Sequence, residues 1–286
     1  MSVYIVPYKM SSQSAKEIAS ALQIKRKRAE RIRSGDFIIN WGSSSIPREI
    51  LETASVVLNH PSSVQNCVDK VEFFRRMVSF GMPIPDFATN QADAARLFKS
   101  NEAVVYCRTL AKSTKGKGIV VAKSPDELVP APLYTVGIPC KREYRVHVIN
   151  EAVVDLTAKV QLNKKNEDYK IPSKYIRNVD NGYVFARDAV KIPDQIRGRL
   201  QSLATNAISY CNLDFGAVDI IRDTKDNLYV LEVNTAPGCT GTTLDQYLKY
   251  LTRNLVEYAS IKESPKKINK AHPEILGWGN IEGDDE

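Results

Sequence analysis

Short apolar runs alternate with amphipathic stretches along the first part of this chain. Apolar runs at 2–6, 37–39 and 56–58 predict strands, and residues 12–22 repeat apolar positions at helical spacing after a serine-rich start. Strands that alternate with helices are typical of a small α/β lobe. We therefore expect an N-terminal α/β lobe over residues 1–65.

The middle of the chain predicts a second unit with a different pattern. Residues 67–80 form an amphipathic pattern that ends at Gly81, which predicts one helix. Apolar runs at 103–108 and 119–122 flank a glycine- and lysine-rich loop, which predicts a β-hairpin with a basic tip. We assign these elements to a central subdomain over residues 66–132.

A third unit is expected over residues 133–262, followed by a charged tail over 263–286. Its predicted strands lie at 133–138, 143–149, 152–156, 216–222 and 228–232, and its predicted helices at 193–211 and 243–260. Residues 161–182 are polar and lack periodicity, so we expect a long loop that closes over a site. The predicted fold class is α/β (α+β).

Composition narrows the class of protein. The 286 residues are 43% hydrophobic and 26% charged, which is typical of a soluble protein with a sizeable core. There is no apolar run of 18 residues and no signal-peptide pattern at the start, so we expect a cytoplasmic protein without a membrane contact. Five scattered cysteines without a CxxC pair predict reduced thiols and no zinc site.

The net charge of +7 is unevenly distributed. A basic cluster lies within 25–33 and consists of Lys25, Arg26, Lys27, Arg28, Arg31 and Arg33. Such a cluster can contact nucleic acid or another polyanion. It can also form a solvated helix face beside an anionic cleft, and the sequence leaves both interpretations open.

Three polar residues near the end of the chain indicate a metal site. Asp219 lies within an apolar strand, and Glu232 and Asn234 end the next one. Glu232 and Asn234 are two residues apart and share a face of their strand, and the tight turn between the strands brings Asp219 beside them. Three oxygen ligands suit Mg²⁺. The alternative is a solvent-exposed polar face, but acids on apolar strands are costly without a cation.

Two loops add candidate anion-binding groups. The first comprises Lys112, Ser113, Thr114, Lys115, Gly116, Lys117 and Gly118, and it lacks the Walker A spacing. It can hold phosphates through backbone N–H groups and lysines, or it can be a basic hairpin turn. The second loop, 234–243, contains Gly238 and can stabilise a developing negative charge or merely cap a helix.

Taken together, these motifs resemble the ATP-grasp superfamily of carboxylate–amine ligases over residues 59–255. The strongest match is LDFGAVDII…LYVLEVNTAPGCTGTTL, which is similar to D-alanine:D-alanine ligases and protein-glutamate ligases. NHPSSVQNCVDKVEFFRRMVSFGMPIPDF and EYRVHVI resemble further family segments, and NWGSS is closest to ATP-grasp proteins often encoded by bacteriophages. The resemblance implies lobes that clasp ATP between them.

The resemblance also implies roles for individual residues. Lys70, Arg108 and the loop residues Lys112, Ser113, Lys115, Gly116, Lys117 and Gly118 would contact the ATP phosphates, with Arg108 standing where the family usually has a lysine. Glu143 would bind the ribose, and Val136 and Ile138 would line the adenine. Asp219, Glu232 and Asn234 would be the magnesium ligands. Arg145, Lys159 and Gly238 would form the catalytic set, and Lys159 would also contact ATP.

The implied reaction uses ATP with Mg²⁺, or with Mn²⁺ in its place. A carboxylate would be activated as an acylphosphate and joined to an amine from an amino acid, a peptide or a protein end. The resemblance leaves a monomer or a dimer open. Two other functions also remain open: an ATP-using enzyme that acts on a nucleotide or nucleic-acid-linked substrate through 25–33, and a non-catalytic nucleotide-binding module.

Overall fold

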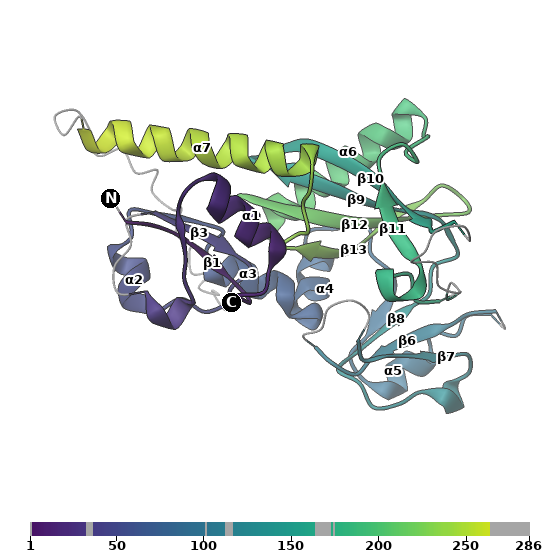
Figure 1. Cartoon of the computed structure of the whole chain (residues 1–286). Helices are drawn as coiled ribbons and strands as arrows, with labels where there is room; N and C mark the ends of the chain where they lie inside the picture. Colours follow the sequence, from purple (N-terminus) through teal and green to yellow (C-terminus); the bar gives the residue numbers. More distant parts are fainter. Residues whose placement is uncertain are drawn as a thin grey trace, which may run out of the picture.

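The computed structural model describes residues 2–32, 37–100, 102–111, 117–163, 173 and 175–263. Three separate sheets organise this part of the chain (Figure 1). One is a parallel sheet of four strands, one is an antiparallel sheet of four strands, and one is an antiparallel sheet of five strands. Each sheet has buried residues of its own, and a long C-terminal helix lies along the first and third sheets (Figure 1).

The N-terminal lobe is the predicted α/β unit. Its sheet has the order β2-β1-β3-β4, with β1 at Val3–Pro7, β2 at Lys25–Arg26, β3 at Phe37–Trp41 and β4 at Val56–Leu58. Alternate residues of a strand point to opposite faces, so Ile5 packs toward helix α1 (Gln13–Ala21) while Val6 packs toward helix α2 (Arg48–Thr53). A 3₁₀ turn, η1 (Ala29–Arg31), follows β2.

The central lobe has its own small core. Its sheet has the order β5-β8-β6-β7, with β5 at Phe87–Ala88, β6 at Val105–Arg108, β7 at Ile119–Ala122 and β8 at Leu133–Val136, together with α5 (Gln91–Ala95) and η2 (Pro125–Glu127). We placed β8 at the start of the third unit, but it pairs with β6 through Val105 and Val136. The central sheet therefore extends past residue 132.

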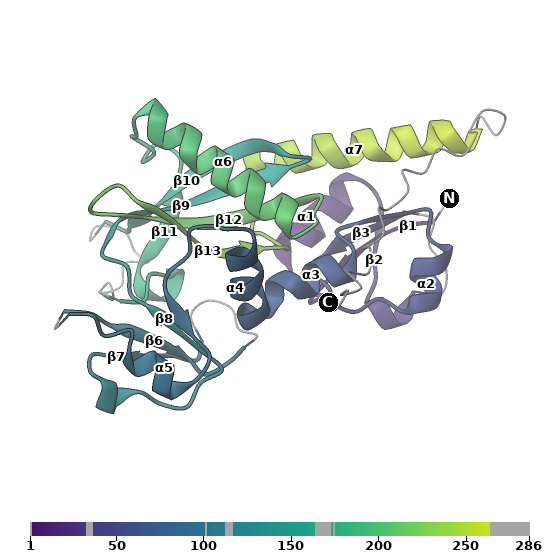
Figure 2. The same ribbon diagram turned by 180° about the vertical axis from the view of Figure 1, so that it is seen from behind.

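The five-stranded sheet has the order β11-β10-β9-β12-β13. Its strands are β9 (Cys140–Ile149), β10 (Ala152–Gln161), β11 (Tyr183–Ala186), β12 (Phe215–Asp223) and β13 (Leu228–Asn234), and η3 (Val179–Asn181) precedes β11. Helix α6 (Asp194–Tyr210) covers its apolar face, where Tyr144, Val146 and Val218 are buried (Figure 2). Helix α7 (Thr242–Glu263) follows β13 through the loop 235–241.

The single helix predicted at 67–80 is two helices. α3 (Pro61–Val68) ends before Asp69, whose side chain caps α4 (Lys70–Ser79) by accepting hydrogen bonds from two backbone N–H groups of its first turn. Phe73 and Phe74 of α4 join the core beneath the five-stranded sheet. This helix, which we assigned to the central subdomain, therefore supports the third sheet.

A buried asparagine joins the N-terminal lobe to the five-stranded sheet. Asn59 follows β4 with a φ of 55°, a conformation that asparagine tolerates better than most residues. Its side-chain oxygen accepts from the backbone N–H groups of Asp214 and Phe215 at 2.8 and 3.2 Å, and its amide nitrogen donates to the carbonyl of Phe215 at 3.0 Å. Trp41 at the end of β3 stacks on the Phe215 ring at 5.2 Å, which adds apolar contact at the same junction.

Some sequence predictions fall largely outside the described residues. These are most of the predicted closing loop 161–182, the phosphate-loop residues 112–116, and the predicted tail beyond Glu263. Among the helices that the structure describes, none is both long and apolar enough to cross a membrane. All five cysteines lie in the described part, and none of them forms a disulfide.

Candidate active site

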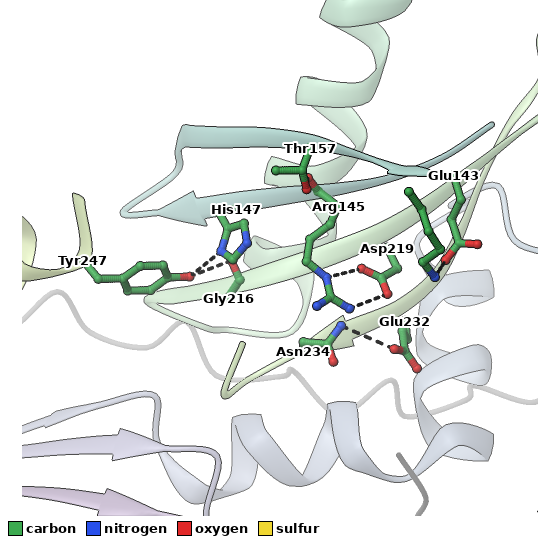
Figure 3. A network of polar contacts seen from close by, with 10 residues as sticks. Glu143, Arg145, His147, Thr157, Gly216, Asp219, Glu232, Asn234 and Tyr247 are labelled. Carbon is green, nitrogen blue, oxygen red and sulfur yellow. Dashed lines mark hydrogen bonds and ion pairs between the residues drawn. The ribbon is translucent and has the colours of Figure 1, made fainter. Parts of the chain in front are cut away.

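The face of the five-stranded sheet opposite α6 carries a grid of polar side chains. Alternation along each strand brings Glu143, Arg145 and His147 of β9 to one face. The same alternation brings Asp155, Thr157 and Lys159 of β10 to that face, together with Asp219 of β12 and with Glu232 and Asn234 of β13. Figure 3 shows most of these side chains, including Arg145, Asp219 and Glu232, on the side of the sheet away from α6. The grid explains why strands that are apolar on one face carry so many charges on the other.

The middle row of the grid crosses four strands. Thr157 lies opposite Arg145, Arg145 opposite Asp219, and Asp219 opposite Glu232. Arg145 donates from Nε and Nη2 to the two carboxylate oxygens of Asp219, at 2.7 Å each (Figure 3). Burial alone would lower the pKa of Arg145, but the Asp219 carboxylate raises it well above its usual range. The guanidinium therefore remains a fixed cation at the centre of the face.

Glu232 lies among cations. Its carboxylate is 3.3 Å from Nζ of Lys70, at the start of α4, and it accepts a long hydrogen bond of 3.4 Å from the Asn234 amide. Burial raises the pKa of Glu232, but Lys70, Arg145, Arg108 and Lys159 together hold it at about 2. The Glu232 side chain is still 39% exposed, so solvent screens part of this attraction.

Arg108 reaches the same region from the central sheet. Its Nε is buried and has no hydrogen-bond partner among the residues that the structure describes. Burial lowers the pKa of Arg108, and the largest opposing effect comes from the Glu232 carboxylate. Because unsatisfied buried donors are costly, an anion between Arg108 and the polar face would stabilise this arrangement.

The outer row pairs Lys159 with Glu143. They lie opposite each other on β10 and β9 and form an ion pair that is mostly buried. Burial raises the pKa of Glu143, against the attraction of Lys159. The ring of Phe185, which lies opposite Lys159 on β11, covers both cations, with its centroid 5.0 Å from the Lys159 Nζ and 4.3 Å from the Arg145 guanidinium carbon. Sequence reasoning did not single out Phe185.

The inner row was also missed from the sequence. Asp155 accepts from Arg187 Nε at 3.0 Å and from Nη2 at 2.8 Å, and both side chains hydrogen-bond to Thr243 at the start of α7. His147 lies 3.3 Å from the Tyr247 hydroxyl, which also donates to the carbonyl of Gly216 (Figure 3). These contacts fix the first turns of α7 against the sheet.

The predicted anion loop runs between β13 and α7. Its backbone is held at Cys239, whose N–H donates to the Ser14 hydroxyl at 3.1 Å. A Cβ added at Gly238 would meet nothing within 4 Å, so the loop is open at this position. The open position next to the polar face is compatible with the anion-stabilising role that we predicted for Gly238.

The predicted nucleotide contacts of the central lobe are described only in part. Lys117 and Gly118 close the hairpin, and Thr109 N–H donates to the Gly118 carbonyl at 2.8 Å. The backbone N–H of Lys70 donates to the Ala111 carbonyl at 3.2 Å, which brings the base of the loop to the start of α4. Lys112, Ser113, Lys115 and Gly116 lie outside the described residues.

The predicted adenine contacts lie at the link between the central and five-stranded sheets. The N–H of Val136 donates to the Asp86 carbonyl at 2.9 Å within the central sheet, so this donor is already used. Ile138 lies past the end of β8, in the short link to β9. The Val136 N–H is therefore not free to donate to an adenine edge.

The predicted metal ligands fit a hard cation. Asp219 and Ala217 lie opposite Glu232 and Asn234, so the two carboxylates and the amide share one corner of the face. In the described part of the chain no group of three or more His, Cys, Asp and Glu side chains has metal-binding geometry, and the proposed set here combines two carboxylates with one amide. Both Asp219 oxygens already accept from Arg145, so a cation would share this carboxylate with the guanidinium.

Comparisons with known proteins identify the architecture. Residues 137–263 match the family model "D-ala D-ala ligase C-terminus". The D-alanyl-alanine synthetase A structure from Vibrio cholerae is similar with a TM-score of 0.68 at 14% identity, covering 91% of this chain and 98% of that one. The structure of the ATP-grasp ligase PsnB with its minimal precursor gives a TM-score of 0.63 at 12% identity, covering 88% and 99%. These structural matches show that the chain has the ATP-grasp fold. The predicted ATP-grasp fold is thereby confirmed.

Two relatives that are similar in sequence are D-alanine–D-alanine ligases. The enzyme of Marinomonas sp. (strain MWYL1) is 30% identical over 210 residues, which are 68% of this chain and 63% of that protein. The enzyme of Buchnera aphidicola subsp. Schizaphis graminum (strain Sg) is 28% identical over 136 residues, which are 44% and 42%. The matched regions thus span less than two thirds of the length of these relatives.

Proposed function

We propose that this ATP-grasp protein is an ATP- and magnesium-dependent ligase that joins a carboxylate to an amine. The observation that carries the proposal is the polar grid, where Lys70, Arg108, Arg145 and Lys159 surround two carboxylates and an amide. A surplus of cations around a small set of oxygen ligands suits a metal-bound polyphosphate. The fold alone does not explain this arrangement, because burying so many charges lowers the stability of the protein unless a ligand compensates them.

In this proposal each group of polar residues has a separate role in binding ATP or the metal. Mg²⁺, with Mn²⁺ as a substitute, would be held by Asp219, Glu232 and Asn234 and would neutralise phosphate charge. Lys70 and Arg108 would bind the transferring phosphates, and Lys112, Ser113, Lys115, Gly116, Lys117 and Gly118 would cover them. Glu143 would accept from the ribose, beside the adenine contacts at Val136 and Ile138.

The reaction would proceed in two displacements. A carboxylate oxygen attacks the γ-phosphorus of ATP, the bond to ADP breaks, and an acylphosphate forms. The amine nitrogen then attacks the acyl carbon, loses a proton, and phosphate departs with the bonding electrons. Arg145 and the backbone N–H near Gly238 would stabilise the negative oxygen of the tetrahedral state, while Lys159 holds the phosphate being transferred.

A double substitution at the metal corner, which consists of Asp219, Glu232 and Asn234, tests this function. Glu232→Gln with Asn234→Ala is expected to abolish magnesium-dependent ADP release, because it removes one charge and two ligand oxygens. Glu257→Gln with Asn254→Ala makes the same chemical changes on the solvent side of α7 and is the matched control. Unchanged ADP release in the Glu232/Asn234 variant would refute the ligase proposal. Screening amino acids, small carboxylates and peptides by ADP release and mass spectrometry would then identify the product.

A further inference from the structure

A pocket in the N-terminal lobe lies outside the polar grid. It has a volume of about 460 Å³, within the usual size range for a small-molecule site. We call it the switch-point pocket and define it by the side chains of Tyr8, Lys9, Arg28, Glu30, Ser43 and Ser45. One of its cations, Arg28, comes from the basic cluster that the sequence analysis left without a role.

The pocket occupies a position in the fold where ligands commonly bind. β1 lies between β2 and β3, and helices α1 and α2 pack on opposite faces of the sheet. The order of strands therefore reverses between β1 and β3. In open α/β sheets, ligands bind outside the carboxyl ends of the strands at such a reversal. The lining residues directly follow the carboxyl ends of β1, β2 and β3.

The turns that line the pocket are held by internal hydrogen bonds. Asn40, which is fully buried, donates to the Ser43 carbonyl at 2.8 Å and accepts from the Ser43 N–H at 2.8 Å. Arg26 donates from Nη1 to the Met10 carbonyl at 2.8 Å, which fixes the turn after β1. The pocket is therefore formed by the fold itself, before any ligand arrives.

One wall of the pocket adjoins the loop that follows the metal corner. Gly42, between Trp41 and Ser43, has a φ of 85°, and a Cβ added there would lie 2.7 Å from the Cβ of Ala236 and 3.5 Å from the Tyr8 ring. Ala236 is two residues beyond Asn234. A molecule in the pocket would thus lie beside the loop that carries Gly238, at the end where the substrates would react.

The charges of the pocket indicate what it would hold. Lys9 and Arg28 are cations, and Glu30 is the single acid among the lining residues. Arg28 Nη1 and Glu30 Oε1 are 3.9 Å apart, too far for a hydrogen bond between them. We propose that the switch-point pocket binds a second, non-reacting carboxylate of the ligase substrate through Lys9 and Arg28. The substrate would then be an acidic amino acid or a short acidic peptide, an inference that rests on the proposed ligase function.

Paired acid and amide probes test this inference on the full chain. Binding of aspartate against asparagine, and of glutamate against glutamine, is measured by calorimetry with a non-hydrolysable ATP analogue and Mg²⁺ present. The amide probes cannot form the charge-assisted hydrogen bonds that the acids form with Lys9 and Arg28. We therefore expect the acids to bind at least about tenfold more tightly than the amides. Lys9→Ala with Arg28→Ala should remove most of this preference. Lys16→Ala with Arg253→Ala, which removes two exposed cations elsewhere, should retain it.

Several outcomes would overturn the inference. They are equal binding of acid and amide, no binding of any acidic probe, or a preference that survives in the Lys9/Arg28 variant. Tighter binding of phosphoserine than of the acids would overturn the assignment to a carboxylate, and an oligonucleotide that displaces the acids would assign the pocket to a polyanion instead. Titration of the ATP analogue alone reports separately on the proposed ligase function, because neither Lys9 nor Arg28 belongs to the polar grid.

Discussion

Arg145 and Asp219 face each other on neighbouring strands and share two hydrogen bonds of 2.7 Å. The Asp219 side chain is only 5% exposed, so solvent compensates its charge very little. We expect Asp219→Asn to lower the free energy of unfolding by about 3 kcal/mol, because it leaves the buried guanidinium without its counter-charge. Urea denaturation followed by circular dichroism measures this loss.

Removing both charges together separates this electrostatic cost from lost packing. The double variant Arg145→Met with Asp219→Leu replaces the pair by apolar side chains, and we expect it to be more stable than Asp219→Asn alone. Both variants should release ADP much more slowly, because both remove the negative charge of a proposed metal ligand. Equal instability of the two variants would show that the charge on Arg145 is not the source of the loss.

Phe185 is expected to support catalysis through the cations that it covers. Phe185→Leu keeps an apolar side chain but removes the ring face, and cation–π interactions at partly buried sites contribute about 1–2 kcal/mol. We therefore expect kcat to fall by about fivefold to thirtyfold with little change in the KM for ATP. Phe185→Tyr keeps the ring and should restore activity. Steady-state ADP release checks both variants, with Val184→Ala as a control on the neighbouring position of β11.

His147 should make the stability of the protein depend on pH. Burial, followed by the charge of Arg145, lowers its pKa to about 4, below the value of about 6.5 for an unfolded chain. As the pH falls from 6.5 toward 4, the unfolded chain therefore binds a proton that the folded protein does not bind. The free energy of unfolding should decrease by roughly 3 kcal/mol across this range from His147 alone.

A neutral replacement isolates the contribution of His147 from that of the carboxylates, which also titrate in acid. His147→Gln keeps a polar side chain near Tyr247 but cannot take up the proton. The difference in unfolding free energy between the two proteins should therefore change with pH between 6.5 and 4 and stay constant above 7. Urea denaturation at a series of pH values measures this difference, and parallel curves over the whole range would contradict the assignment.

The parts of the site that follow from local periodicity were predictable. Glu232 and Asn234 are two residues apart on one strand, and a short turn joins that strand to the one with Asp219. Glu143 and Arg145 are likewise two residues apart in the strand predicted at 143–149, so alternation brings them to a common face. These relationships depend on one or two neighbouring strands, and the sequence contains all the information that they need.

Relationships between distant strands were not predictable in the same way. The register that sets Asp219 opposite Arg145 joins strands more than 70 residues apart, and the irregularity after Asp219 shifts the pairing with β13. Phe185 reaches Lys159 only because β11 joins the outer edge of the sheet. We assigned β8 to the wrong sheet, because the sequence of a short apolar strand does not indicate which of two sheets it will join.

The hydrogen bonds of Asn59 bear on how the substrate specificity of this protein could change in evolution. Its hydrogen bonds join the N-terminal lobe directly to Asp214 and Phe215, at the start of β12, the strand that carries Asp219. The switch-point pocket and the metal corner thus lie on one frame, which is the N-terminal lobe joined to the five-stranded sheet. The central lobe has a separate core. Substitutions among the pocket side chains could therefore alter the selected substrate while the distance to the reacting phosphate remains set by this frame. A new specificity would require no change in the central lobe.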